Sequence, residues 1–123
     1  MKKIGLFLIL VSFALTGAIS WAASNVEKGK EAFEENGCTG CHKIGSDWNG
    51  PDLTGVTTYR TKEWIIDFVL HTKKHYDDPI VRSMINRFNL YMPDQGVEPK
   101  DAELIYNYLK SLADDAGKQK KKK

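Results

Sequence analysis

The sequence has few of the residues that cross-link or stiffen small folds, with two cysteines and four prolines in 123 residues. Cys38 and Cys41 are so close in sequence that a disulfide between them would close a very short loop and remove little chain entropy. No stretch has the alternation of a convincing strand, and no internal repeat is present. The length allows one small domain, and a domain of this size often needs a prosthetic group or another staple.

A basic folded part is also missing, although the formal net charge is +2. Without Lys2, Lys3 and the five lysines of residues 118–123, the body holds 11 basic residues against all 16 acidic ones, a balance of −5. No Lys/Arg cluster in this body is interleaved with aromatic residues, so we expect no nucleic-acid binding. The Lys-rich end offers no large apolar side chain to bury, and we expect a disordered tail over residues 116–123.

The first residues have the layout of an exported precursor. Two lysines precede an apolar run over residues 4–15, and small residues then lead to an A-x-A-like site at Ala22 or Ala23. This pattern predicts a signal peptide over residues 1–22 and a periplasmic protein. The alternative is an uncleaved membrane anchor, because residues 4–23 carry no charge and are just long enough to span a bilayer.

Helical periodicity dominates the rest of the chain. Four helices are predicted from their start signals and apolar stripes, beginning at Ser24 or Asn25, at Thr61, at Asp78-Pro79 and at Pro99. The first should end near Gly37, directly before the cysteines. Residues 43–58 and 89–98 are rich in turn-forming residues and are predicted to be loops. The prediction is therefore an all-α domain over residues 23–115.

The two cysteines belong to a Cys-x-x-Cys-His motif, which is the attachment motif of c-type haem. Two thiols at this spacing, on a turn beside a helix, can each form a thioether with one of the two vinyl groups of the same haem. His42 follows directly and is then held with its imidazole toward the iron. We therefore predict one covalent haem c on Cys38 and Cys41, with His42 as an iron ligand.

Two other uses of these cysteines are open. A redox-active dithiol normally lies in a thioredoxin-like β-α-β context, and this sequence predicts no strands. A zinc site could combine Cys38 and Cys41 with His71 and His75, whose spacing puts both histidines on one helical face. That site needs a long spacer between cysteines and histidines, and it leaves His42 without a role.

A six-coordinate haem iron needs a second axial ligand. Apart from the initiator, the methionines are Met84 and Met92. Met84 lies on the apolar stripe of a predicted helix, where a core role is the default. Met92 lies in a loop, where Pro93 restricts it to an extended conformation, and we predict that Met92 binds the iron. His71 and His75 have charged neighbours, which indicate a solvated helix end.

With these motifs in this order along the chain, the protein resembles the class I cytochromes c from residue 24 to about residue 113. The shared elements are a first helix with Gly29 and Phe33, the haem motif at 38–42, Asn49-Gly50-Pro51-Asp52-Leu53, Tyr91-Met92-Pro93, and a last helix with Ile105 and Tyr108. The resemblance implies the cytochrome c fold, with about four helices wrapped around one covalently attached haem. It also implies that the first and last helices cross at the glycine, phenylalanine, isoleucine and tyrosine just named.

The resemblance further implies roles for residues around the haem. The Pro51 carbonyl would accept a hydrogen bond from Nδ1 of His42, which fixes the ring and strengthens the imidazole as a donor to iron. The family uses Trp, Tyr or Arg side chains as donors to the haem propionates. The candidates here, which the sequence leaves unassigned, are Trp48, Tyr59, Arg60 and Trp64.

Such a site is expected to transfer single electrons and not to act as an enzyme, because His and Met ligands fill both axial positions. A soft thioether also favours ferrous iron and raises the potential. We expect a monomer whose redox partners bind transiently and carry basic patches that suit the acidic body. The alternative is a haem peroxidase or an NO- or CO-binding cytochrome, in which Met92 is labile or absent from the iron.

The lysine tail carries a separate prediction. Each Lys near an anionic lipid surface contributes roughly 1 kcal/mol at low salt, so the tail could hold the protein at a membrane. It could equally bind an acidic partner, or do no more than solubilise the end of the chain.

Overall fold

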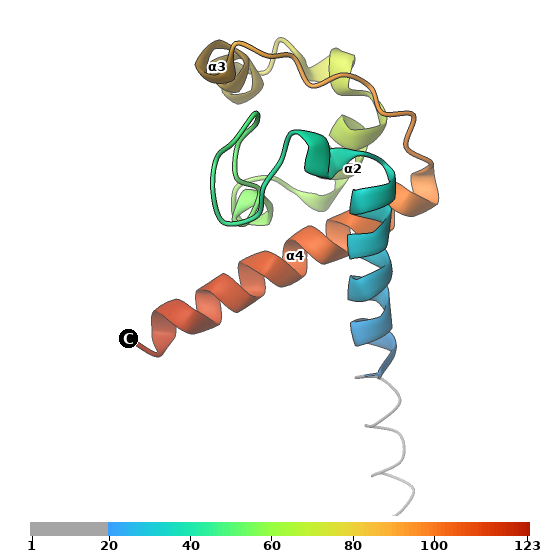
Figure 1. The fold of residues 1–123 in the computed structure, drawn as a ribbon, viewed down its shortest axis with the longest axis vertical. Coiled ribbons are helices and arrows are strands. Elements are labelled where there is room, and N and C mark those ends of the chain that lie inside the picture. The colour runs from blue at the N-terminus through green and yellow to red at the C-terminus, as the bar shows by residue number, and fades with distance from the viewer. Residues whose placement is uncertain (1–19) are drawn as a thin grey trace, which may run out of the picture.

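The structure is a computed structural model that describes residues 20–123 (Figure 1). The signal peptide or anchor predicted over residues 1–22 lies almost entirely outside the described residues. An N-terminal helix over residues 20–35 is followed by η1 (Cys38–Gly40), η2 (Val56–Thr58), α2 (Lys62–Leu70), η3 (Thr72–His75), α3 (Pro79–Phe88) and α4 (Pro99–Lys121). The described residues form no strand beyond one isolated bridge, so the predicted all-α fold with four main helices is confirmed.

The predicted start signals of α2 and α3 act as caps. The Thr61 side chain accepts a hydrogen bond from the Trp64 N–H at 3.2 Å. Asp78 Oδ1 accepts the N–H groups of Ile80 and Val81 at 2.9 and 3.2 Å. A proline occupies the first turn of both α3 and α4, where its missing N–H costs nothing. No helix within residues 20–123 combines the length and the hydropathy needed to cross a membrane.

The N-terminal helix begins earlier than predicted. Residues 20–23 are already helical, so Ser24 and Asn25 lie inside the helix and do not cap it. No residue in this stretch breaks a helix, and its two alanines favour one. The end of the helix agrees with the prediction, because Gly37 follows it with φ 76°, a left-handed conformation that glycine reaches at little steric cost.

The N-terminal helix crosses α4 (Figure 1), and Gly29 lies at this crossing, against Leu104 and Tyr108 of α4. A Cβ on Gly29 would lie 2.1 Å from the Leu104 carbonyl oxygen and 2.9 Å from Tyr108 Cβ, so only glycine permits this approach. Phe33 packs against Tyr108 with ring centroids 5.6 Å apart, and Ile105 is 2% exposed. The helix crossing that the family resemblance implied is therefore confirmed.

One apolar core joins the crossing helices to α2. Its buried members are Ala32, Phe33, Cys38, Ile65, Val97, Ala102, Ile105 and Leu109. By contrast, α3 contributes no buried residue and lies apart from α4, at the top of Figure 1. The amphipathic α3 therefore directs its apolar stripe toward something other than this core.

The C-terminal segment differs from the prediction. Residues 116–121, expected to be disordered, continue α4 as helix (Figure 1). Ion pairs support this extension, from Lys110 to Asp114 at 2.8 Å and from Lys118 to Asp115 at 3.2 Å. The cations of its last turn also suit the negative end of the helix dipole. Disorder was predicted from the composition of this segment alone. A segment that extends an existing helix avoids the cost of nucleation, and composition does not reveal this.

Asp78 connects the start of α3 to the loop before α2. Besides capping α3, its carboxylate accepts a hydrogen bond from Arg60 Nη2 at 2.5 Å, and both side chains are largely buried. Burial alone would raise the pKa of Asp78, but the bonds from Arg60 and two backbone N–H groups outweigh it and hold that pKa below its usual value. The resulting stabilisation is complete above about pH 4 and is lost as the pH falls through the lowered pKa.

We expect Asp78→Ala to lower the free energy of unfolding by about 2 kcal/mol near neutral pH, because it removes the cap and leaves Arg60 unpaired. Asp78→Asn keeps a capping oxygen and should cost less. Urea unfolding of the haem-loaded protein at about pH 7 and about pH 3 measures both. The difference in unfolding free energy between wild type and Asp78→Asn should be smaller at the lower pH. A difference that does not change with pH would contradict a stabilising role of the Asp78 charge.

Candidate functional site

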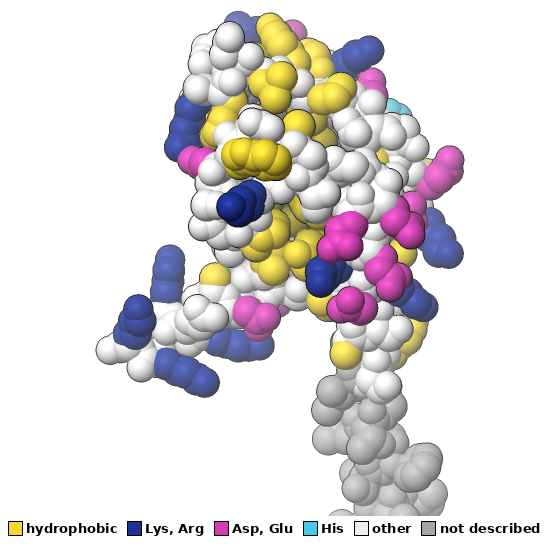
Figure 2. All heavy atoms as spheres, viewed as in Figure 1, with side chains coloured by type: hydrophobic (Ala, Val, Ile, Leu, Met, Phe, Trp, Pro, Cys, Tyr) yellow, Lys and Arg dark blue, Asp and Glu magenta, His cyan; other side chains and the backbone are white. Residues whose placement is uncertain are grey.

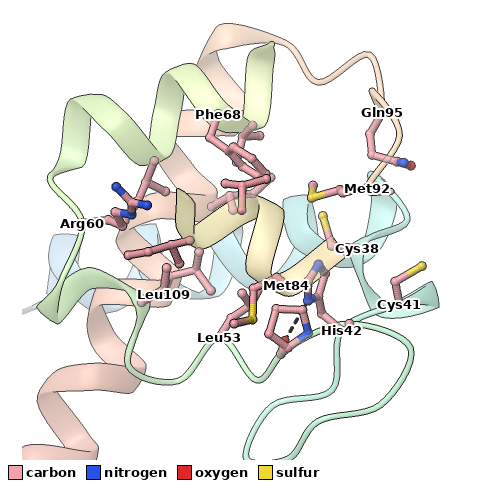
Figure 3. Close-up of a pocket in the computed structure, with 18 of the residues that line it drawn as sticks. Cys38, Cys41, His42, Leu53, Arg60, Phe68, Met84, Met92, Gln95 and Leu109 are labelled. Atoms are coloured by element: carbon pink, nitrogen blue, oxygen red, sulfur yellow. Dashed lines mark hydrogen bonds between the residues drawn. The ribbon is translucent and has the colours of Figure 1, made fainter. Parts of the chain in front are cut away.

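An apolar cavity opens between α2, α3 and the adjoining loops (Figure 3). Nearly every element contributes to its wall, including Cys38, Cys41 and His42 at η1, Leu53 and Arg60 of the next loop, Trp64 and Phe68 of α2, Met84 of α3, Met92 and Gln95 of the last loop, and Leu109 of α4. All five residues that the sequence singled out for the site line this one cavity. They are Cys38, Cys41, His42, Pro51 and Met92.

The His42 ring is held by one hydrogen bond. Its Nδ1 lies 2.9 Å from the carbonyl oxygen of Pro51, and a carbonyl only accepts, so Nδ1 carries the hydrogen and Nε2 keeps its lone pair. Burial lowers the pKa of His42, and the bond to Pro51 opposes only part of this effect. The ring is therefore neutral near pH 7, in the form that binds a metal through Nε2.

Gly50 brings the Pro51 carbonyl close enough to reach that ring. A Cβ on Gly50 would lie 3.0 Å from Cε1 and 3.2 Å from Nδ1 of His42. The Gly50 N–H donates to the Cys41 carbonyl at 2.8 Å, which ties this loop to the haem motif. A side chain at position 50 would push the loop and the imidazole apart.

Cys38 and Cys41 are both free thiols at the cavity. The η1 turn that carries them is closed by the His42 N–H, which donates to the Cys38 carbonyl at 2.9 Å. Burial raises the pKa of the Cys38 thiol to about 11, so this thiol is not ionised near pH 7. Redox-active dithiols need a lowered thiol pKa, and the dithiol interpretation therefore has no support here.

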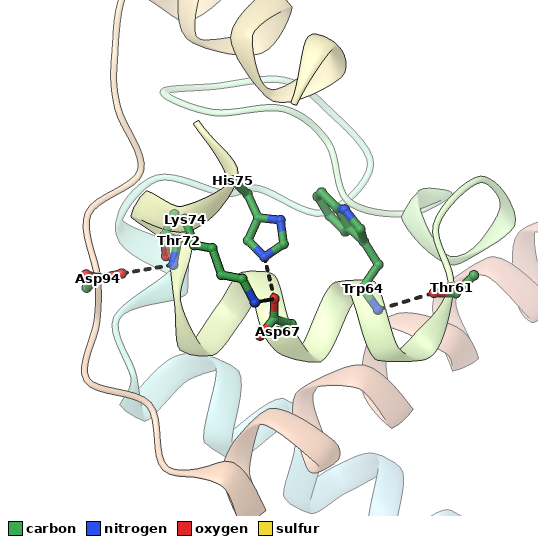
Figure 4. Close-up of polar contacts among 7 residues, drawn as sticks. All are labelled: Thr61, Trp64, Asp67, Thr72, Lys74, His75 and Asp94. Carbon is green, nitrogen blue, oxygen red and sulfur yellow. Dashed lines mark hydrogen bonds and ion pairs between the residues drawn. The ribbon is translucent and has the colours of Figure 1, made fainter. Parts of the chain in front are cut away.

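The zinc interpretation lacks a ligand set. Neither His71 nor His75 lines the cavity with the cysteines, and residues 20–123 hold no group of three or more His, Cys, Asp or Glu side chains placed to bind a metal ion. His75 Nε2 instead lies 2.8 Å from Asp67 Oδ2, and its ring packs edge-on against Trp64 (Figure 4). The His75 side chain is 13% exposed, so the predicted solvated position is wrong for this residue, whereas His71 is exposed.

Both candidate methionines lie at the cavity, on different elements (Figure 3). Met84 belongs to α3, and Met92 belongs to the loop over residues 89–98. The Tyr76 hydroxyl donates a 2.7 Å hydrogen bond to the Met92 carbonyl oxygen. No pattern in the sequence indicated this contact, which holds the Met92 backbone against the segment after α2.

Three of the four proposed propionate donors, Tyr59, Arg60 and Trp64, line the cavity. Trp48 is 56% exposed and does not line it. The Arg60 guanidinium lies 4.0 Å from the centroid of the Trp64 ring and is also bonded to Asp78. These two contacts hold a positive charge at a largely apolar wall, where it suits a carboxylate of a bound group.

The lining of the cavity suits an apolar group with an anionic edge. The apolar residues of α3 line it, although α3 buries no side chain completely, so a group filling the cavity would complete the burial of this helix. Two thiols, one neutral imidazole and a thioether are the donors of a covalently attached haem. The residues present therefore fit haem c, which would supply a one-electron redox centre between these side chains.

A comparison with known families decides the assignment. The family model described as Cytochrome c matches residues 26–113, which is most of the chain. This chain belongs to the cytochrome c family. The covalently attached haem c predicted from the cysteine motif is the cofactor of that family, and the prediction is confirmed. Haem-based electron transfer is the general function that membership supports.

Solved structures of cytochromes c have the same fold. A cytochrome c from Rhodothermus marinus superposes with a TM-score of 0.71 at 24% identity, covering 76% of this chain and 80% of that one. An engineered form of that protein gives a TM-score of 0.69 at 24% identity, covering 75% of this chain and 80% of its own. At this identity the likeness establishes the fold alone.

One curated relative matches a shorter stretch. The Cbb3-type cytochrome c oxidase subunit CcoP of Helicobacter pylori is 43% identical over 54 residues. The match covers 40% of this chain and 18% of CcoP, so this chain corresponds to a small part of that protein.

Proposed function

We propose that this protein carries single electrons between redox proteins in the periplasm, through one haem c with His42 and Met92 as axial ligands. The observation that carries the proposal is the single cavity that gathers both thiols, the neutral His42 imidazole and Met92. Two protein ligands leave no open axial position, which favours electron transfer over catalysis. The apolar wall favours ferrous iron, because the ferric form brings an additional charge into a low-dielectric site.

We assign the haem domain to residues 23–115 and an export signal to residues 1–22. Covalent attachment of haem in bacteria takes place outside the cytoplasm, so a chain with this motif needs export. A retained N-terminal segment would instead anchor the same domain to the membrane.

The rim of the cavity supports transient docking. Tyr59, Ile80 and Leu90 line the cavity and are 58%, 46% and 45% exposed. A small apolar rim suits the small interfaces of redox encounters, and we expect the carrier to be a monomer. Because part of this chain resembles an oxidase subunit, a cytochrome c oxidase is a candidate partner.

Carboxylates gather over the N-terminal helix on the face shown in Figure 2. The exposed ones on this helix are Glu27, Glu31, Glu34 and Glu35. They would attract a partner with a basic patch and accelerate its encounter at low salt.

Met92→Ala in the haem-loaded full chain is the test of the axial ligand. It should abolish the long-wavelength charge-transfer band of ferric haem with a thioether ligand, and lower the midpoint potential by on the order of 100 mV. Met84→Ala is the matched control, since it removes a methionine from the same cavity and should keep the band. Optical spectra and potentiometric titration measure both variants.

The opposite result, with the band lost in Met84→Ala and kept in Met92→Ala, contradicts the assignment of Met92. A wild type that lacks the band and binds NO or CO at an open iron position contradicts the carrier function. That result would support the haem peroxidase or gas-binding alternative.

We also propose that the lysine tail holds the protein at an anionic lipid surface. The α4 extension carries these lysines away from the body (Figure 2), where a membrane could reach them. Truncation after Gly117 should abolish co-sedimentation with phosphatidylglycerol vesicles and leave the potential unchanged. Phosphatidylcholine vesicles are the control, and equal sedimentation of both chains with anionic vesicles contradicts this role.

A further inference from the structure

The loop that carries Met92 lacks regular structure of its own. Residues 89–98 form no helix or strand before α4 begins. Two hydrogen bonds tie this loop to the chain around η3. The Tyr76 hydroxyl donates to the Met92 carbonyl at 2.7 Å, and the Thr72 N–H donates to Asp94 Oδ1 at 2.9 Å (Figure 4).

These two bonds lie on either side of Pro93 and restrain the loop next to Met92. Thr72 is 0% exposed, so its N–H depends on Asp94 for a partner, although the Asp94 side chain itself is 41% exposed. The Tyr76 ring lines the cavity and packs edge-on against Tyr91, with centroids 5.0 Å apart. The Tyr76 hydroxyl is the donor of its bond, since the Met92 carbonyl oxygen can only accept.

The η3 turn is itself fixed to α2, so it can act as a rigid support. His75 Nε2 and Lys74 Nζ both lie 2.8 Å from Asp67 Oδ2 (Figure 4). The His75 ring also packs against Trp64 and Phe68, at centroid distances of 5.1 and 5.6 Å. Because the cavity wall includes both aromatic rings, the same short turn connects the α2 wall to the Met92 loop.

We propose that Tyr76 is a positioning residue that keeps the Met92 thioether on the haem iron, with Asp94 as the second anchor of the same loop. The inference rests on the proposed function, which assigns Met92 as the axial ligand. Tyr76 acts through the backbone and not on the sulfur. Movement of Met92 away from the iron would have to break or bend the hydrogen bond from Tyr76. We call the bonds from Tyr76 to Met92 and from Thr72 to Asp94 the clamp. The clamp slows dissociation of Met92 and restricts the access of small molecules to the iron.

Ligand exchange with imidazole tests the clamp directly. In excess imidazole, the exchange rate of the ferric haem-loaded protein becomes independent of imidazole concentration once Met92 dissociation limits it. Tyr76→Phe retains the ring and removes the donor, so this limiting rate should rise about fivefold, the effect of one hydrogen bond. Asp94→Ala should raise it by a similar factor.

Tyr91→Phe is the matched control. Tyr91 packs against Tyr76 and is 59% exposed, and its hydroxyl makes no hydrogen bond with residues 20–123. Its limiting rate should stay within about twofold of wild type. If Tyr76→Phe takes up no haem, Asp94→Ala supplies the same comparison.

Equal limiting rates in wild type, Tyr76→Phe and Asp94→Ala overturn the clamp, while a persisting charge-transfer band leaves Met92 ligation intact. A different result would be a wild type that lacks this band and whose rate of imidazole binding rises in proportion to imidazole concentration. It would mean that Met92 does not bind the iron. That outcome overturns the clamp together with the proposed ligation.

Discussion

Replacing Cys38 and Cys41 together by alanine is expected to abolish covalent haem attachment completely. Both thiols lie at the apolar cavity and neither is used in a disulfide, so each is available for a thioether bond. Without haem, the cavity that the apolar side chains of α3 line would be left unfilled, and α3 would lack a partner for its apolar stripe. The double variant should therefore also lose helical content and become sensitive to proteolysis.

Haem staining of a denaturing gel and the intact mass of the chain measure this directly. Each single cysteine variant keeps one thioether and should retain part of the stain. Thr39→Ala, an exposed position between the two cysteines, is the control and should retain all of it. Haem that stays on the double variant after denaturation contradicts attachment through these cysteines.

Gly29→Ala is expected to cost about 3 kcal/mol of unfolding free energy or more, the upper end of overpacking effects. The added Cβ would lie 2.1 Å from the Leu104 carbonyl oxygen, and that backbone cannot move aside without separating two helices. Gly117→Ala is the matched control, since nothing lies within 4 Å of its added Cβ. In that exposed part of α4 the change should be neutral or stabilise by up to about 1 kcal/mol.

Urea unfolding of the two haem-loaded variants gives the comparison. The midpoint for Gly29→Ala should fall well below that of wild type, and the midpoint for Gly117→Ala should not. Similar midpoints for both variants would mean that the close crossing of the two helices does not stabilise the fold.

The starts of α2, α3 and α4 were predictable from sequence because capping side chains and first-turn prolines are local signals. Thr61 and Asp78 each bond N–H groups two or three residues away, a distance that residue types alone reveal. The crossing at Gly29 was available only from the resemblance, since an apolar stripe does not say which other stripe it meets. Residues 116–121 continue α4 as helix where we expected disorder, because composition does not show that a segment prolongs an existing helix.

The site residues that belong to a sequence motif could be predicted. Contacts between residues far apart in the sequence could not. The haem motif and the loop methionine identified residues that line one cavity. The bond from Tyr76 to Met92 joins residues 16 positions apart with no shared periodicity, so no pattern indicates it. His75 was misplaced because its charged neighbours suggest solvent, whereas Asp67 satisfies its Nε2 and the ring of Trp64 covers its side.

A spectroelectrochemical titration of the haem-loaded wild-type protein tests the central claim most directly. We predict a single reversible one-electron transition between a ferrous c-type spectrum and a ferric spectrum with the thioether charge-transfer band. Under the proposed ligation, in which His42 and Met92 would fill both axial positions, added CO should leave the ferrous spectrum unchanged. A colourless protein, or a ferrous haem that binds CO readily and shows no such band when oxidised, would contradict it.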